Sequence, residues 1–261
     1  DGANVTIPAI SIRDVTMDYP TPDGVNHVLD HVSYDVAEGH FVSIVGPSGV
    51  GKTTLLRLLT GLASPTGGEI HVRGERLSSS PDGLAVVLQD YTRSLMPWLT
   101  VAKNISLPLR RAKMSRTALR ERVEESLAEV GLTGTDRSYP WQLSGGMQQR
   151  VSIARAIAVR PSILVMDEPF ASVDAQTRFD LEDLVLKVRD DFGITTVMVT
   201  HDIDEAVYLS DEIVVLHGKP AAVRDVVKVD IPFPRSQMAT RNDHRFAELR
   251  TRVYGIVRGL E

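Results

Sequence analysis

The chain has 261 residues, of which 43% are hydrophobic and 24% are charged, and its formal net charge is −5. A chain of this size can bury a sizeable core as one large domain or two lobes, and its acidic balance disfavours nucleic acid as the main partner. The absence of cysteine excludes disulfides and thiolate metal sites. Its longest apolar runs are about five or six residues, far below the roughly twenty that span a bilayer, and no signal peptide opens it, so we expect a soluble protein.

Alternation of apolar and polar residues predicts two strands near the start of the chain, over 10–17 and 28–36, with a turn from Pro20 to Gly24 between them. We expect them to form an antiparallel β subdomain. Tyr19 stands at the end of the first strand, where an aromatic ring either stacks on a nucleotide base or packs on the sheet edge. The sequence leaves both roles of Tyr19 open.

The next segment, 46–53, reads Gly-Pro-Ser-Gly-Val-Gly-Lys-Thr and satisfies the pattern G-x-x-x-x-G-K-[ST] at every constrained position. The apolar run 41–45 before it predicts a buried parallel strand, and residues 54–59 predict a helix. Glycines let successive N–H groups turn toward an anion, and the helix N-terminus adds the positive end of its dipole. Lys52 and Thr53 then suit nucleotide phosphates and Mg²⁺. A chance glycine-rich turn is the alternative.

Residues 61–90 are rich in glycine and proline and contain short predicted strands at 69–72 and 85–88, the second followed directly by Gln89. Helical periodicity then begins, with Leu119, Val123, Leu127 and Val130 on one face of a helix that starts at Ser115 and ends at Gly131. These patterns predict a helical lobe inserted at about 91–160 into an α/β core.

A second helix of this lobe is predicted over 145–159, with Ser144 as its N-cap and Pro161 after its end. The sequence Ser144-Gly145-Gly146 therefore stands at an exposed helix start, which suits an anion. As a bare pattern it is also a common capping arrangement.

Two later strands end in chemically active residues. The apolar run 163–166 leads into Asp167 and Glu168, a pair that suits Mg²⁺ and an attacking water in a phosphate-loop protein, or else forms an acidic loop. The strand 195–200 leads into His201, which is equally a turn residue or a phosphate sensor. None of the seven histidines makes a zinc-binding pattern. Helices are predicted over 175–192 and 202–209, and a strand over 213–216.

In this order, the motifs resemble those of the nucleotide-binding subunit of an ATP-binding cassette transporter. The matching segments lie between residues 10 and 218: the loop 46–53, Gln89, 143–146, 163–168, 172–174 and 200–202. The resemblance implies an α/β fold with a P-loop NTPase (RecA-like) core, an N-terminal antiparallel β subdomain and the inserted α-helical subdomain. It implies an ATPase domain over 1–218 and a C-terminal extension over 219–261 with a short helix. Met147 departs from the family, in which many members have Gln there.

The resemblance also implies a role for each matching residue. ATP would be held by Tyr19, stacked on adenine, and by Gly46, Ser48, Gly49, Gly51, Lys52, Thr53 and Thr54 around its phosphates. Mg²⁺ would be held by Thr53, Gln89 and, through water, Asp167. Glu168 would be the general base, Gln89 would sense the attacking water, and His201 would contact the γ-phosphate. Ser144, Gly145 and Gly146 would contact ATP held by a second protomer, with Asp174 at the seam of a homodimer that encloses two ATP.

A narrower resemblance is to the importer group for nitrate, sulfonate and taurine. It rests on 89–91 with 95–101, on 139–142, 167–170 and 201–206, and on a tail over 220–261 that contains Ile231-Pro232-Phe233-Pro234-Arg235 and a helix near 246–257. It implies uptake of a small anionic solute through two transmembrane permease subunits, and indirectly an extracytoplasmic solute-binding protein. The chain would lie on the cytoplasmic face of a prokaryotic cell membrane, with no nucleic-acid partner.

The apolar cluster 95–99, which contains Met96 and Trp98, has two interpretations. It packs into the helical lobe, or it forms one side of a groove for a cytoplasmic helix of the membrane partner, as the resemblance implies. Other classes with the same site are an efflux or lipoprotein-release ATPase, whose members usually lack such a tail, and a soluble non-transport ATPase. The latter usually carries two cassettes, a long coiled coil or zinc cysteines.

Overall fold

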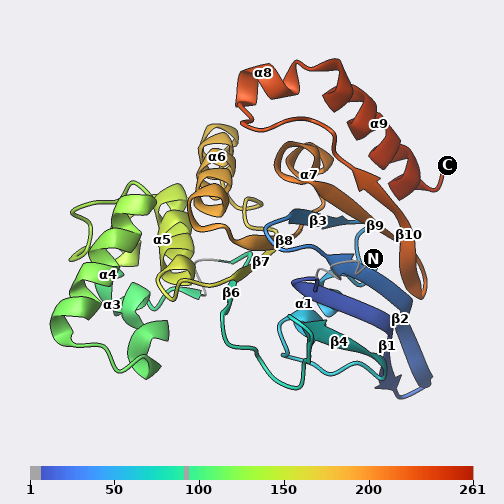
Figure 1. Ribbon diagram of the computed structural model, residues 1–261, viewed down its shortest axis with the longest axis horizontal. Helices are drawn as coiled ribbons and strands as arrows, with labels where there is room; N and C mark the ends of the chain where they lie inside the picture. Colours follow the sequence, from blue (N-terminus) through green and yellow to red (C-terminus); the bar gives the residue numbers. More distant parts are fainter. Residues whose placement is uncertain (1–6, 91–93, 261) are drawn as a thin grey trace, which may run out of the picture. The chain divides into compact units, whose positions relative to one another are not determined.

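The structure is a computed structural model that describes residues 7–90 and 94–260 (Figure 1). Tyr91, on which part of the narrower resemblance rests, lies outside the described residues. The chain divides into two compact units. The first takes in the described residues up to Asp82 together with those from Thr195 onward, and the second runs from Gly83 to Ile194.

An antiparallel ladder opens the first unit. Its strands are β1 (Ile10–Thr21), β2 (Gly24–Val36), β4 (Gly67–Val72) and β5 (Glu75–Arg76). β1 pairs with both β2 and β4, and β4 pairs with β5, all antiparallel. The buried apolar side chains are Ile10, Ile12, Val15 and Met17 of β1 and Leu29, Val32 and Val36 of β2, and register shifts in the β1–β2 pairing interrupt the strict alternation. The predicted antiparallel β subdomain is confirmed.

Parallel strands form the core of the same unit. β3 (Phe41–Val45) lies between β8 (Thr195–Val199) and β9 (Glu212–Gly218) and runs parallel to both. Every residue of β3 and β8 is buried, which explains why β3 reads as a nearly continuous apolar run. The strand order within this unit is β5-β4-β1-β2-β10-β9-β3-β8.

Strand β10 (Ala221–Lys228) joins the two parts of this sheet, because it pairs antiparallel with β9 and lies parallel to β2 at Ala221 and Leu29. The sequence patterns did not identify it. A shift in register between Val223 and Asp225 interrupts the alternation that marks a strand. The boundary drawn at 218/219 thus falls in a turn between two paired strands.

Four helices of the first unit lie in its described residues, and capping residues mark the ends of several. They are α1 (Lys52–Leu59), α7 (Ile203–Leu209), α8 (Gln237–Arg241) and α9 (His244–Arg258). Asp202 caps α7 and Asp243 caps α9, and Gly259 ends α9 in a left-handed conformation. The short α8 was not predicted, and α9 includes the helix predicted near 246–257.

The second unit combines two parallel strands with helices. β6 (Leu84–Val87) pairs with β7 (Ile163–Asp167). The helices are α3 (Val101–Ser106), α4 (Arg116–Glu129), α5 (Gly145–Ile157) and α6 (Ala175–Phe192), with short 3-10 turns at Pro108–Arg111 and Pro140–Gln142. Figure 1 shows α3 and α4 beside α5, the helix against which both pack.

Two details of the predicted helices are refined. In the apolar stripe of α4, Val123 and Leu127 are buried, and so is Val130 just after the helix, whereas Leu119 is only half-buried. Helix α5 ends at Ile157 rather than Val159, because Arg160 takes a left-handed conformation (φ 50°) immediately before Pro161.

None of the helices within the described ranges has the length and apolarity needed to cross a membrane.

Candidate active site

The loop 46–51 connects β3 to α1, and its geometry explains its glycines. A Cβ on Gly46 would lie 2.5 Å from the carbonyl oxygen of Leu216 in β9, so any side chain there would collide with the sheet. Gly49 (φ 72°) and Gly51 (φ 118°) adopt conformations that L side chains rarely take. The loop is therefore shaped by close packing at one end and by left-handed turns at the other.

Lys52 is buried although it is charged, and its side chain folds back over this loop. Its Nζ donates hydrogen bonds to the carbonyl oxygens of Gly46 (2.8 Å) and Pro47 (3.1 Å). The N-cap of α1 is Gly51, which has no side chain with which to cap the helix. The first N–H groups of α1 and the Lys52 ammonium thus suit a phosphate. Ser48 and Thr53 are exposed near them in the sequence.

His201 lies at the same edge of the first unit's sheet as this loop. β3 and β8 are parallel with Ile44 opposite Val199, and the N–H of Thr200 donates to the carbonyl oxygen of Ile44 at 3.2 Å. Because carboxyl ends of neighbouring parallel strands meet at one edge, the segment that contains the exposed His201 leaves the sheet beside the start of the loop at Gly46. Tyr19 is half-buried opposite Asn26 in the β1–β2 ladder, and its role stays a prediction.

In the second unit, the ends of β6 and β7 bring Gln89 and Glu168 together. Val87 pairs with Met166, and two residues further on the Nε2 of Gln89 donates to the Oε2 of Glu168 at 3.3 Å. Glu168 has φ 42°, a left-handed conformation that is costly for a residue with a Cβ and is frequent at functional sites. Asp167 occupies the last position of β7.

The capped starts of α5 and α6 approach each other at one threonine. Ser144 caps α5 by accepting from the N–H of Met147, and Asp174 caps α6 by accepting from the N–H of Thr177. A Cβ on Gly146 would lie 2.3 Å from the Cγ2 of Thr177. The hydroxyl of Thr177 donates to Asp174 at 2.6 Å, and this bond lowers the pKa of the Asp174 carboxyl. Gly145 lies half-buried between the cap and this contact.

Two residues of this arrangement were missed by the sequence patterns. Thr177 was read only as part of a helix, although a threonine at the third position after an Asp cap is a local signal for such a bond. Gln149 is fully buried and donates from Nε2 to the carbonyl oxygen of Pro169 at 2.7 Å, which ties α5 to the segment after Glu168. No sequence signal marks that contact.

The site residues therefore fall into two groups, one in each unit. The first unit groups 46–54 with His201. The second contains Gln89 with Glu168, Asp167 directly before Glu168 in sequence, and the helix starts at Ser144 and Asp174. In the described part of the chain, no three His, Asp or Glu side chains gather in a way that could hold a metal ion.

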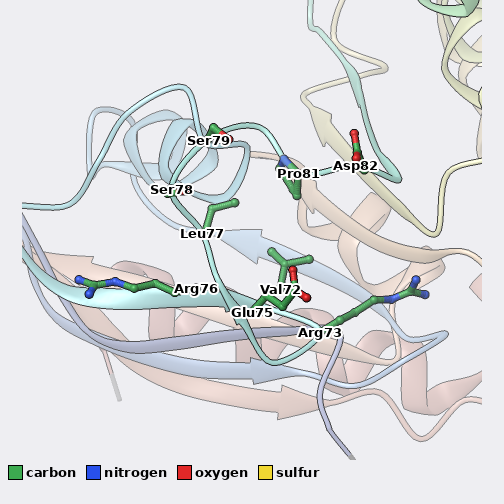
Figure 2. A pocket seen from close by; sticks show the side chains of 9 residues that line it. All are labelled: Val72, Arg73, Glu75, Arg76, Leu77, Ser78, Ser79, Pro81 and Asp82. Atoms are coloured by element: carbon green, nitrogen blue, oxygen red, sulfur yellow. The ribbon is translucent and has the colours of Figure 1, made fainter. Parts of the chain in front are cut away.

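A separate pocket of about 370 Å³ lies in the first unit between the β4–β5 turn and residues 77–82 (Figure 2). Figure 2 shows its two arginines, Arg73 and Arg76, extending in opposite directions, and they pair with Glu38 and Glu69 respectively. No predicted site residue lines it. Its cations do not converge on a ligand, so we do not assign it to the nucleotide.

Comparison with known proteins identifies the family. The family model described as "ABC transporter" matches residues 29–171, more than half of the chain. The aliphatic sulfonates import ATP-binding protein SsuB of Bacillus cereus is 38% identical over 244 residues, which cover 94% of each chain. The nitrate transport protein NasD of Klebsiella oxytoca is 38% identical over 250 residues, covering 94% of this chain and 95% of that protein.

Among solved structures, the dimeric post-hydrolysis state of the ATP-binding cassette MJ0796, bound to ADP and Pi, superimposes with a TM-score of 0.73. It is 34% identical and covers 86% of this chain and all of its own. The chain therefore belongs to the ABC transporter family, and it is an ATPase with the P-loop NTPase fold of that family. The predicted family, fold and activity are confirmed.

The contact between Gly146 and Thr177 gives a test of the packing in the second unit. Gly146→Ala places a methyl group against the Thr177 Cγ2 and should lower the free energy of unfolding by about 1–3 kcal/mol. Thr177→Ser removes that Cγ2 but keeps the hydroxyl that bonds Asp174, so the double variant should recover most of the loss. Urea denaturation of both single variants and the double variant measures this, and a double variant no better than Gly146→Ala would contradict it.

Proposed function

We propose that this ATPase powers an importer that takes up a small anionic solute of the nitrate, sulfonate or taurine type through two separate membrane subunits. The observation that carries the proposal is the similarity to SsuB and NasD, which extends over 94% of this chain. An extracytoplasmic solute-binding protein would supply the solute. The chain itself would act at the cytoplasmic face of the membrane without touching the solute.

The residues of the two units suit hydrolysis of the γ-phosphate of ATP. The N–H groups of the loop 46–51 and the Lys52 ammonium would hold the β- and γ-phosphates, with Thr53 and Thr54 at the start of α1 and His201 on the γ-phosphate. Glu168 would accept a proton from the attacking water as that oxygen bonds to the γ-phosphorus and the bond to ADP breaks. Gln89, which bonds Glu168, would orient the same water.

Mg²⁺ would be held by Thr53, Gln89 and, through water, Asp167, and it would neutralise charge on the phosphates. Tyr19 would stack on the adenine. Both assignments come from the resemblance of the ordered motifs to those of the family.

A homodimer completes the proposed site. Ser144, Gly145 and Gly146 lie at the start of α5, where backbone N–H groups favour an anion. They would contact ATP bound by the other protomer, with Asp174 at the seam. The 34% identical cassette whose dimer was solved with ADP and Pi supports this arrangement.

The membrane partner would dock on the apolar segment 95–99. Leu95 is buried, and the side-chain amide and carbonyl of Asn104 bond the backbone of Met96 in both directions. This anchoring leaves Trp98 with 71% of its surface exposed. An exposed tryptophan on a fixed loop suits an interface anchor.

Glu168→Gln should slow ATP turnover by roughly 10²- to 10⁴-fold while leaving ATP binding intact, because it removes the general base and keeps the shape of the side chain. ATP should then stay enclosed between two protomers. Size-exclusion chromatography with and without ATP measures this as an ATP-dependent dimer. A variant that binds ATP but stays monomeric would contradict dimer formation by the isolated subunit.

Lys52→Ala and His201→Ala should separate binding from hydrolysis. Loss of the Lys52 charge should weaken ATP binding, because its ammonium would contact two phosphates, whereas loss of His201 should spare binding and lower turnover. Calorimetry of nucleotide binding alongside phosphate release measures both. Equal loss of ATP affinity in the two variants would show that the separate roles are wrong.

Trp98→Glu should leave ATPase activity of the isolated subunit within about twofold, because the ring is exposed, yet remove an interface anchor that commonly contributes 2 kcal/mol or more. Co-purification with the permease subunits and ATP-driven uptake of nitrate or taurine in vesicles should both fall. Met238→Glu, at an equally exposed apolar residue of α8 (78%), is the matched control. Unchanged assembly and uptake in Trp98→Glu would exclude this surface from the partner interface.

A further inference from the structure

The residues that follow β10 pack on α7. Figure 1 shows α8 and α9 beside α7, and α7 and α9 are in contact. Phe246 of α9 and Tyr208 of α7 are both buried. Helix α7 has only seven residues, too few to be stable by itself in water, so its position depends on such tertiary contacts.

Arg235 holds the C-terminal end of α7. Its Nη1 donates to the carbonyl oxygens of Tyr208 (2.7 Å), Ser210 (2.9 Å) and Val207 (3.3 Å), and its Nη2 donates to that of Ile231 (2.9 Å). The last carbonyls of a helix lack N–H partners within the helix, and the dipole favours a cation there. Arg235 is only 9% exposed, so it acts as a buried cap supplied from 25 residues or more along the chain.

The same segment contacts the N-terminal end of α7. The guanidinium groups of Arg241 and Arg250 lie 3.7 Å and 3.9 Å from the Oδ2 of Asp204. Arg241 also lies over the rings of Tyr208 (5.1 Å) and Phe246 (5.5 Å), one on each helix. The C-terminal segment therefore contacts both ends of α7.

The start of α7 is in turn bonded to the backbone beside His201. Asp202 accepts from the N–H groups of Asp204 (2.9 Å) and Glu205 (3.2 Å). The hydroxyl of Thr200 accepts from the N–H of Asp202 and donates to the buried carboxylate of Glu205 at 2.6 Å. A displacement of α7 would therefore carry the 200–202 backbone, and with it the exposed His201 ring.

We propose that residues 229–258 position His201 for ATP hydrolysis by fixing α7, and that Arg235 is the main positioning residue. The inference rests on the proposed function, in which His201 contacts the γ-phosphate. The carbonyl groups that Arg235 bonds belong to α7, to Ser210 just after it and to Ile231, and none of these is a predicted nucleotide-binding residue, so the effect on His201 would act through α7. Loss of its guanidinium leaves carbonyl groups at the end of α7 without a buried donor, which favours a shift of the helix toward water.

Kinetics of the full-length ATPase test the proposal. Arg235→Met should lower kcat about 10-fold to 100-fold, because small displacements of reacting groups have effects of that size. The KM for ATP should stay within about twofold, since the loop at Lys52 is unaltered. Arg235→Lys keeps the charge and should recover part of the rate. Arg252→Met, at an exposed arginine of α9 that pairs with Asp225 of β10, is the matched control and should change neither constant.

A double variant separates positioning from general stability. Arg235→Met should not lower the residual rate of His201→Ala any further, when rates are scaled to the ATP bound per subunit. The same fold-loss in both backgrounds would overturn the positioning role and leave the proposed function standing. If His201→Ala itself keeps full kcat, the assignment of His201 fails and the inference fails with it.

A milder variant covers the case in which Arg235→Met does not fold. Asp204→Asn removes the carboxylate charge that Arg241 and Arg250 contact, on a side chain that is 40% exposed, and should lower kcat severalfold with KM unchanged. Full kcat in both Asp204→Asn and Arg235→Lys would overturn the inference.

Discussion

The arrangement of the first unit depends on one packing constraint, the close approach of the loop at Gly46 to the carbonyl oxygen of Leu216. That contact requires β9 beside β3, and the parallel pairing of β3 with β8 brings the segment of His201 to the same edge. Lys52 then folds onto the loop carbonyls rather than into solvent. A flexible glycine-rich loop is thereby held in one shape by a rigid sheet, which is the preorganisation that phosphate chemistry requires.

In the second unit, helix capping has a similar organising effect. Ser144 and Asp174 each satisfy free N–H groups at a helix start, and Thr177 connects the two helices at Gly146. Gln149 adds a buried bond from α5 to the carbonyl oxygen of Pro169, next to Glu168. The helix start that would contact a second nucleotide is thus fixed to the segment that carries the proposed general base.

The C-terminal segment is part of the fold rather than an appendage. β10 pairs with β9 within the sheet, and α9 packs on the short helix α7. Because α7 begins two residues after His201, a segment remote in sequence from the phosphate loop is connected to His201 through the packing on α7 and through side-chain caps that accept from the N–H groups of Asp202 and Asp204. This gives the tail a physical role in a fold whose motifs all lie before residue 218.

The features that the sequence determined by itself are local. The glycines of the loop, the cap at Ser144, and the apolar runs of β3 and β7 follow from backbone conformation and burial, which act over a few residues. The order of the sequence motifs along the chain also pointed to the family. The roles assigned to the site residues remain predictions.

Only the tertiary structure decided what distant residues do to one another. Arg235 bonds carbonyls 25 to 28 residues upstream, and Gln149 bonds one 20 residues downstream. β10 joins the sheet despite an interrupted alternation, because β9 and β2 supply its neighbours. No local pattern encodes these contacts, since the partner of each polar group is chosen by which chain segments the folded core brings together.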